Sequence, residues 1–453
     1  MDRKRLIGVT AAIACMALAL GACGGSSGGS SSSAGGSAKS PKGNVNWWTW
    51  DDKQAASYKK CLPGFQQKYP DVKVKISQYS VDSYFTKLTA GFVAGNAPDA
   101  FQNSVPLLGE YAGQKQIMPL DDLIKKSKLD MSRFTVGADS WKYTDGKQYG
   151  LPLDWAAAAF YYNEAMIKSA GLTDKDMQGM TWNPTDGGTF AKIVAKLTVD
   201  KKGVRGDQAG FDPKHIKTYG VGSLGSGDFN GQASWNMFAS SLGWKMGNKD
   251  AWPTKLNFDD PKFTSTVKFA KSLSDKGYAP QFGQFTTSTD QQIGSGSVAM
   301  VEDGSWVAPT FNKLQGVKIG IAPPINGPAG RSVISNSNAN NIFVGTKNLD
   351  ATWAWVTYMG SVDCQSTAGA DGTFLPSIQA AMTSAAAAQA KNGLNLSVFT
   401  NLLTNHEVYP APPTVNGQQL VDTLQPEFQA YFSGSADISV FNKATTQSEQ
   451  ILK

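Results

Sequence analysis

The sequence predicts an α/β fold in which two lobes, each a mostly parallel sheet flanked by helices, are joined by three chain crossings. At 453 residues the chain exceeds what one core usually supports, so two lobes are expected. Strand-like and helix-like segments alternate with short connections, a pattern typical of parallel sheets covered by helices. Three extended segments break this alternation, and each is predicted to carry the chain between lobes: Pro152–Asn163, Ser335–Gly345 and Gly372–Ser377.

The first 43 residues predict export and anchoring. Arg3–Arg5 precede an apolar run, Leu6–Leu20, that has the length of a signal-peptide core and is too short for a membrane span. Small residues then precede Cys23, which resembles a bacterial lipobox and implies lipidation of this cysteine. We therefore expect a signal peptide at 1–22 and a lipidated Cys23 followed by a flexible Gly/Ser tether at 23–43, on the extracellular side of the bacterial membrane. An ordinary signal peptide with an incidental cysteine is the alternative.

Composition argues against several functional classes. The net charge of +6 is dispersed along the chain, so no nucleic-acid partner is expected. The two histidines, His215 and His406, have no Cys, His or Asp cluster at metal-ligand spacing, so neither a metal nor a cofactor is expected. Gly220–Gly225 matches a GxGxxG pattern without a clear strand-to-helix context, which favours a flexible loop.

Cysteine usage predicts one disulfide. With Cys15 in the signal peptide and Cys23 lipidated, only Cys61 and Cys364 remain in an exported chain. An oxidising compartment favours a bond between them. Two free, buried thiols are the alternative.

Lobe one is expected to comprise residues 44–152 and 335–373. Asp51 and Asp52 suit the N-cap of a first helical segment, which should break at Pro63. The strands expected in this lobe are 44–50, 72–78 and 98–104.

Lobe two is expected to comprise residues 153–334 and 374–453. Pro152–Asn163 leads into it as an extended segment, because its aromatic residues favour a strand over the helix that its four alanines favour. Asn163 suits the cap of the next helix. Helices are expected at 234–243 and 260–277, each closed by a glycine, and strands at 297–303 and 317–324.

The first crossing also carries a family resemblance. Its pattern Pro-Leu-Asp-x4-Ala-Phe-Tyr-Tyr-Asn-x3-Ile, from Pro152 to Ile167, resembles the signature of the family 1 extracellular solute-binding proteins of ABC transporters. It departs from that signature at Ser169, where a charged or amide residue is usual. FQQKYPDVKVKI, AGNAPDAF, SGSVAMVEDGSW and FLPS occur in the family's order. The resemblance implies a periplasmic-binding-protein-like fold with a three-segment hinge, and a carbohydrate ligand delivered to a membrane permease. We expect a monomer without enzymatic activity.

The candidate site follows from where ligands bind in open α/β sheets, at the carboxyl ends of strands. A sugar cleft needs aromatic platforms and bidentate polar side chains. Trp306 matches a family position that stacks on sugar, and Trp50 follows the first strand, whereas Trp47 and Trp48 are expected in the core. The candidate ligand-binding residues are Trp50, Asp51, Asp52, Lys53, Asn103, Ser104, Asp154, Trp155, Phe229, Trp235, Trp306, Ser335, Asn336, Asn338, Tyr409 and Asn416.

Other functions stay open on the sequence. Asp51 and Asp154 could act as the acid and base of a glycoside hydrolase. A surface adhesin for polysaccharide, or a binder of a peptide or polyamine, is the other alternative. A polyamine site needs several converging carboxylates, and the candidate residues are mainly amides, hydroxyls and aromatics.

Overall fold

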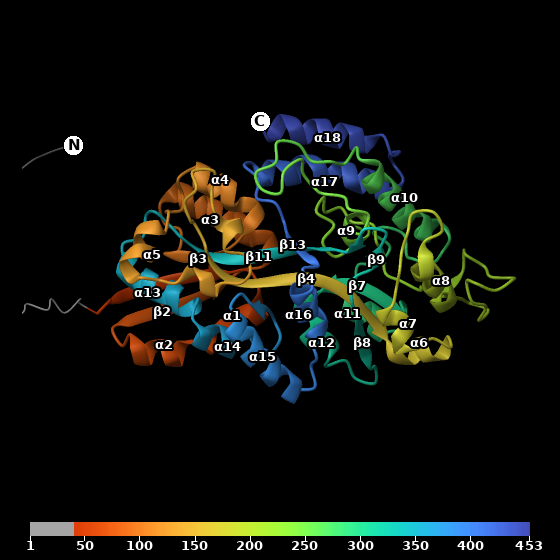
Figure 1. Cartoon of the computed structure of the whole chain (residues 1–453), viewed down its shortest axis with the longest axis horizontal. Helices are drawn as coiled ribbons and strands as arrows, with labels where there is room; N and C mark the ends of the chain where they lie inside the picture. The colour runs from red at the N-terminus through yellow and green to blue at the C-terminus, as the bar shows by residue number, and fades with distance from the viewer. Residues whose placement is uncertain (1–39) are drawn as a thin grey trace, which may run out of the picture. The chain divides into compact units, whose positions relative to one another are not determined.

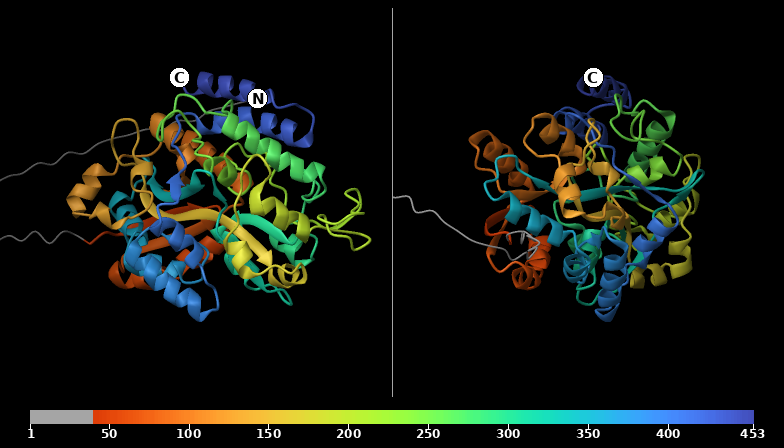
Figure 2. Two further views of the ribbon diagram at one scale, coloured as in Figure 1. Left: turned by 45° about the vertical axis from the view of Figure 1, so that its right-hand side comes forward. Right: turned by 60° about the vertical axis from the view of Figure 1, so that its left-hand side comes forward.

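A mixed sheet of nine strands, with helices on both of its faces, organises the chain (Figures 1 and 2). The computed structural model describes residues 40–453; the predicted signal peptide, Cys23 and nearly all of the tether lie outside the described residues. The strand order is β12-β4-β11-β3-β1-β2, with β13 on β11 and with β7 and β8 on β4. The strands are β1 (Gly43–Thr49), β2 (Val72–Gln78), β3 (Ala100–Ser104), β4 (Leu151–Asn163), β5 (Val199–Asp200), β6 (Ile216–Thr218), β7 (Met300–Gly304), β8 (Ile319–Ala322), β9 (Asn326–Gly327), β10 (Gly330–Arg331), β11 (Val333–Ile342), β12 (Leu375–Pro376) and β13 (Val408–Pro410).

Helices fill most of the connections between these strands. They are α1 (Asp52–Lys59), α2 (Leu62–Lys68), α3 (Val81–Ala94), α4 (Leu108–Gly113), α5 (Asp121–Ser127), α6 (Glu164–Ser169), α7 (Asp174–Gln178), α8 (Gly188–Leu197), α9 (Asn236–Ser240), α10 (Pro261–Asp275), α11 (Thr289–Gly294), α12 (Ala308–Phe311), α13 (Leu349–Met359), α14 (Val362–Gly369), α15 (Gln379–Lys391), α16 (Ser397–Thr404), α17 (Gly417–Ser433) and α18 (Val440–Ile451). Short 3-10 turns add η1 (Val105–Leu107) before α4 and η4 (Ser305–Val307) before α12.

The first crossing is confirmed as one continuous strand. Its first part, Leu151–Ala157, pairs with β11, and from Ala158 onward it pairs with β7 and β8. All 13 residues of β4 are buried, which explains why the sequence shows no polar alternation there. Asn163 ends the strand and caps α6, because its side-chain oxygen accepts from the backbone N–H groups of Ala165 and Met166.

The sheet is mixed, not mostly parallel as expected. β1 is parallel to both β2 and β3, as βαβ units require. However, β11 is antiparallel to β3 and β4, and β4 is antiparallel to β7 and β8. The chain leaves along β4 and returns along β11, so these two crossing strands must run in opposite directions.

Buried hydrophobic residues form three clusters that follow the crossings. One cluster draws on residues between Trp155 and Ile334 and again between Leu375 and Leu452. The other two draw on residues between Val45 and Leu153 and between Ala339 and Ala381. We call the part of the chain around the first cluster lobe two and the part around the other clusters lobe one; the residue boundaries given above stay predictions.

The break in the first helical segment lies at Lys60–Cys61, not at Pro63. α2 begins at Leu62, so Pro63 falls in its first turn. A proline is tolerated there because no intrahelical partner is available for its missing N–H.

Two later elements are shorter than expected. α9 begins only at Asn236, because a turn at Gly231 precedes it and the Trp235 ring packs against that glycine. β7 begins only at Met300, because Val298 pairs instead with Tyr219.

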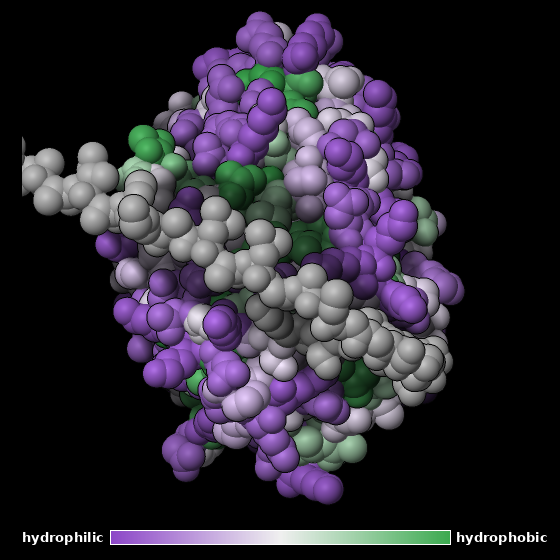
Figure 3. Space-filling model, turned by 90° about the vertical axis from the view of Figure 1, so that its left-hand side faces the viewer, coloured by the Kyte–Doolittle hydropathy of each residue, from purple (hydrophilic) through white to green (hydrophobic). Residues whose placement is uncertain are grey.

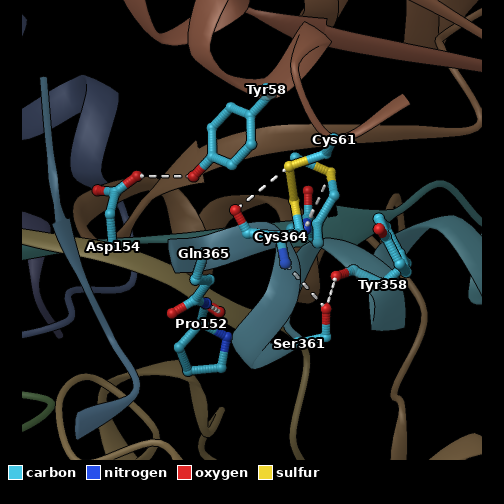
Figure 4. Close-up of a disulfide and its surroundings, with 10 residues drawn as sticks. Tyr58, Cys61, Pro152, Asp154, Tyr358, Ser361, Cys364 and Gln365 are labelled. Atoms are coloured by element: carbon cyan, nitrogen blue, oxygen red, sulfur yellow. Dashed lines mark hydrogen bonds between the residues drawn. A yellow bond between two sulfur atoms is a disulfide. The ribbon is translucent and has the colours of Figure 1, made fainter. Parts of the chain in front are cut away.

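Cys61 and Cys364, the pair expected from the cysteine count, form a disulfide (Figure 4). Cys61 lies between α1 and α2, Cys364 lies on α14, and their Cα atoms are 5.2 Å apart. Both are almost fully buried. The bond therefore fastens the first helices of lobe one to a helix that precedes the third crossing.

Figure 3 shows a face covered mainly by hydrophilic side chains, with hydrophobic ones largely recessed. Among residues 40–453, no helix combines the length and apolar character of a membrane span, and no group of three or more potential metal-ligating side chains was found.

Candidate functional site

The lobe-one candidates lie where β1 and β3 end. The two strands are parallel neighbours, so their carboxyl ends meet at one edge of the sheet. Asn103 is buried and Ser104 is partly exposed at the end of β3. Trp50 follows β1 and packs against Tyr84 and Phe85, with ring centroids 5.3 and 5.5 Å away, while part of it stays exposed.

The three residues after Trp50 have separate roles. Asp51 caps α1, since its Oδ1 accepts from the backbone N–H of Gln54 at 2.7 Å. Asp52 is exposed at the start of the same helix. Lys53 reaches lobe two, where its Nζ donates to Thr310 Oγ1 of α12 at 2.7 Å. This contact joins α1 of lobe one to the segment of lobe two that begins with Trp306.

Trp306 lies in η4 immediately after β7, and the chain is built to hold its ring. A Cβ on Gly304 would lie 2.2 Å from the ring of Trp306, so the indole rests directly on the glycine backbone. The side chain is nevertheless partly exposed. Trp306 therefore has a fixed orientation and open area, as a stacking platform needs.

Asp154 lies in the first crossing and is 1% exposed. Asn338 Nδ2 donates to its Oδ1 at 2.7 Å, and Tyr58 OH donates more weakly to its Oδ2 at 3.4 Å (Figure 4). Burial raises the pKa of Asp154 to about 7, the two hydrogen bonds oppose the rise, and the charge of Asp51 adds to it. Asp154 thus ties β4 to β11 and to α1 from a buried position.

The structure does not bring Trp155 or Trp235 to a surface, which contradicts their predicted role as sugar platforms. Both are fully buried. Trp235 is enclosed by aromatic side chains, stacked on Phe428 at 5.7 Å and in edge contact with Phe263 at 5.0 Å. Phe229 is also buried, at 4% exposure. Their apolar character serves the core of lobe two.

The remaining candidates are divided among different places. Ser335 and Asn338 are buried in β11, and Asn336 between them is partly exposed. Tyr409 donates to Asn236 Oδ1 at 2.7 Å and lines a separate cavity of about 550 Å³ together with Trp244 and Lys245. Asn416 precedes α17 and donates to the carbonyl of Ile451, so it fastens the two C-terminal helices together.

Several buried polar atoms on or beside these candidates have no hydrogen-bond partner within residues 40–453. Among them are Asn103 Nδ2 at the end of β3, Ser305 Oγ beside Trp306, and Asn336 Oδ1 and Asn338 Oδ1 in the second crossing. A buried polar group left unpaired costs about 1–3 kcal/mol. Donors and acceptors on a bound ligand would remove that cost, so these atoms, drawn from both lobes and a crossing, favour a ligand rich in hydroxyl groups.

Sequence reasoning missed one residue, Glu302. It lies on β7, is 6% exposed, and neither carboxylate oxygen has a partner in the described part of the chain. The signal was present: Glu302 follows Met300 at the two-residue period of a strand, so it shares a face with an apolar neighbour. A charged residue at such a position is unusual and marks a site to inspect.

Together the lobes, the crossings and the paired strand ends define a two-lobed α/β binding protein. The bacterial extracellular solute-binding protein family matches residues 63–394, and the chain belongs to this family. The chain is also similar to the lactose-binding protein of Rhizobium radiobacter, at 28% identity over 31% of this chain and 34% of that protein. It is similar to the maltodextrin-binding protein MdxE of Bacillus subtilis, at 25% identity over 59% of this chain and 58% of that protein. These matches span between about a third and three fifths of the relatives' own lengths.

Solved structures confirm the fold class. The chain resembles the ABC substrate-binding protein Lmo0181 of Listeria monocytogenes in complex with cycloalternan, with a TM-score of 0.75 and 20% identity, covering 91% of this chain and 98% of that one. It resembles UspC of M. tuberculosis with a TM-score of 0.71 and 22% identity, covering 90% and 100%. At these identities the likeness concerns the fold.

Proposed function

We propose that this protein is the extracellular substrate-binding component of an ABC transporter and that it captures a carbohydrate, an oligosaccharide, between its lobes. The observation that carries the proposal is Trp306, a partly exposed ring held against Gly304 beside the unpaired hydroxyl of Ser305. An aromatic face next to free polar atoms matches a sugar, which presents an apolar ring face and a fringe of hydroxyl groups.

The names of similar proteins support this class of ligand. Lactose and maltodextrin appear in the names of two relatives, and cycloalternan is bound in one similar structure. A further similar structure, CpMnBP1, is described with mannotriose bound. These are different sugars, so they favour a saccharide in general and select none.

Hinge closure is the proposed means of capture. In this proposal β4 carries the chain from lobe one (44–152 and 335–373) to lobe two (153–334 and 374–453), β11 carries it back, and β12 is the third segment of the hinge. A ligand that touches both lobes binds the closed form more tightly and so shifts the population toward it. The closed monomer then docks on the permease, held near the membrane by the lipid on Cys23 and the tether that follows it.

A panel of oligosaccharides tests the proposal. The mature protein is titrated with α- and β-linked disaccharides and trisaccharides of glucose, galactose and mannose and of the corresponding 2-amino sugars, and binding is measured by thermal shift and calorimetry. We expect at least one to bind and to raise the melting temperature further as its concentration increases, approximately with the logarithm of the concentration above the Kd. The same mixtures are assayed for new reducing ends: binding without turnover supports the proposal, whereas enzyme-level turnover, or no binding at all, contradicts it.

Trp306→Ala is expected to weaken the binding of the sugar identified by that panel by about 30-fold, which corresponds to ~2 kcal/mol for truncation of a central aromatic contact. Trp353→Ala is the matched control, because Trp353 is also partly exposed but lies on α13 in lobe one, packed against the core there. Calorimetry measures the affinity of both variants for that sugar. Equal affinity in wild type and Trp306→Ala would refute the stacking role.

A further inference from the structure

A small cavity in lobe two is lined in part by Glu302, whose carboxyl group is buried. The cavity has a volume of about 130 Å³, less than the roughly 150 Å³ of a cavity that holds a benzene ring, so there is room for an amino group and the carbon that carries it but not for a whole sugar ring. Hydroxyl and amide side chains contribute most of the other polar lining, namely Ser223, Gln281, Thr289 and Gln292.

The cavity adjoins the predicted sugar platform along the chain. Glu302 comes two residues before Gly304, the glycine that supports the Trp306 ring. Phe285, which is partly exposed, also lines the cavity. A sugar stacked on Trp306 would therefore lie beside the end of β7 that carries Glu302.

The charged form of Glu302 is unfavourable in these apolar surroundings unless a positively charged group pairs with it. It pairs directly opposite Phe160 in the sheet, and Phe160 packs against Phe190 at 5.5 Å. Burial raises the pKa of Glu302 well above its usual range, and the charge of Asp303 raises it further. A buried carboxylate without a partner is strongly disfavoured, so in the free protein Glu302 is expected to be protonated.

The charges around Glu302 are negative. Asp303 follows it on β7 and accepts a hydrogen bond from Thr289 Oγ1 at 2.6 Å. Asp290 on α11 is close enough to raise the pKa of Asp303. No Lys, Arg or His is found among the described residues that line the cavity. Glu302 is therefore the carboxyl group on the lining of the cavity, and the charges nearest to it are negative.

We propose that this cavity receives a protonated amine carried by the bound saccharide, so that the ligand is an amino sugar. This inference rests on the proposed function of carbohydrate binding. The ammonium group supplies the positive partner that Glu302 lacks, and its N–H groups can donate to Glu302 and to hydroxyl or amide oxygens of the lining. On binding, the carboxyl group of Glu302 loses one proton to solvent and becomes the carboxylate partner of the ammonium; no other bond changes.

Matched sugars that differ at one position test the inference. The probes are glucosamine, galactosamine and mannosamine, each compared with its neutral parent hexose, and the β-1,4-linked trimers of glucosamine and N-acetylglucosamine compared with cellotriose. Affinities of wild type are measured by calorimetry at pH 7 in two buffers of different ionisation enthalpy. We expect at least one amine to bind tenfold or more tightly than its neutral parent, with release of up to one proton that the parent does not cause.

Glu302→Gln is the decisive variant, because it keeps the size and polarity of the side chain and removes the charge. It should lose the amine preference and the proton release, while Glu449→Gln, the same change at a salt bridge with Lys453 on the C-terminal helix, should keep both. Neutral sugars binding as well as amines would overturn the inference and leave the proposed function intact. An amine preference that persists in Glu302→Gln would also overturn it, and binding of spermidine with no sugar bound would overturn both.

Discussion

Replacing Cys61 and Cys364 with alanine is expected to lower the free energy of unfolding by about 5 kcal/mol. The two residues are separated by 303 positions, so the bond closes a very long loop that contains the 153–334 part of lobe two. In the chain-entropy account, cross-linking reduces the freedom of the unfolded chain by an amount that grows with the logarithm of loop length, and the relation gives ~6 kcal/mol for a loop of this size before native-state strain is subtracted. Urea unfolding of wild type and the double variant, followed by tryptophan fluorescence, measures the difference.

Two polar contacts beside the disulfide join the same parts of the chain as the bond does. Close to Cys61, Ser57 Oγ and Lys60 Nζ both bond to Asp371 Oδ2, at 2.6 and 2.8 Å. Asp371 follows α14, the helix that carries Cys364, so the bond and these contacts hold the same two parts of the chain together. Reduced wild type is the proper control, since it keeps both side chains and loses only the bond. If reduction leaves the unfolding midpoint unchanged, the loop-closure argument fails.

Local pattern was enough to predict the strands and crossings. β2 coincides with the predicted 72–78, because its alternation of apolar and charged residues has the period of a half-exposed strand. β4 was predicted from Pro152 and its aromatic residues even though four alanines favour a helix. The Asp51 cap was likewise predictable, because capping depends on residues close in sequence.

The direction in which a side chain points was harder to predict than the strands. Trp235 and Trp306 both adjoin short helical turns, yet one is enclosed by Phe263 and Phe428 and the other is partly exposed. What separates them is tertiary packing, which residue type and spacing do not encode. The contact of Asp303 with Thr289 was hidden for the same reason, since β7 and α11 meet only in the folded chain.

Whether neighbouring strands are parallel or antiparallel could be predicted only in part. Short βαβ connections predict parallel neighbours, and β1, β2 and β3 follow that rule. A segment that passes between lobes is not bound by it, because its partner arrives from a distant part of the sequence. β4 and β11 are paired although almost 200 residues separate them, and the hydrogen bond from Asn338 to Asp154 joins them where they pair.

Asp154→Asn is expected to stabilise the protein at pH 8 and to have little effect at pH 4. The folded pKa of Asp154, about 7, lies above the value of 3.8 of an unperturbed aspartate. The stabilising contribution of its protonated form is therefore fully present below pH 4 and is lost as the pH rises through 7. A difference of about 3 pKa units corresponds to ~4 kcal/mol. Asparagine can keep the bond from Asn338 and donate to Tyr58, but it never takes on the buried charge.

The measurement is the melting temperature between pH 5 and 8. In wild type it should fall by several degrees over this range, and Asp154→Asn should flatten the fall. Glu302 contributes in the same direction, because its pKa is also raised by burial, so the double variant with Glu302→Gln should be flatter still. Asp250→Asn, at an exposed salt bridge with Lys245, is the control and should follow wild type. A wild-type slope in Asp154→Asn would mean that Asp154 is already charged in the folded hinge at neutral pH, stabilised there by contacts other than those with Tyr58 and Asn338.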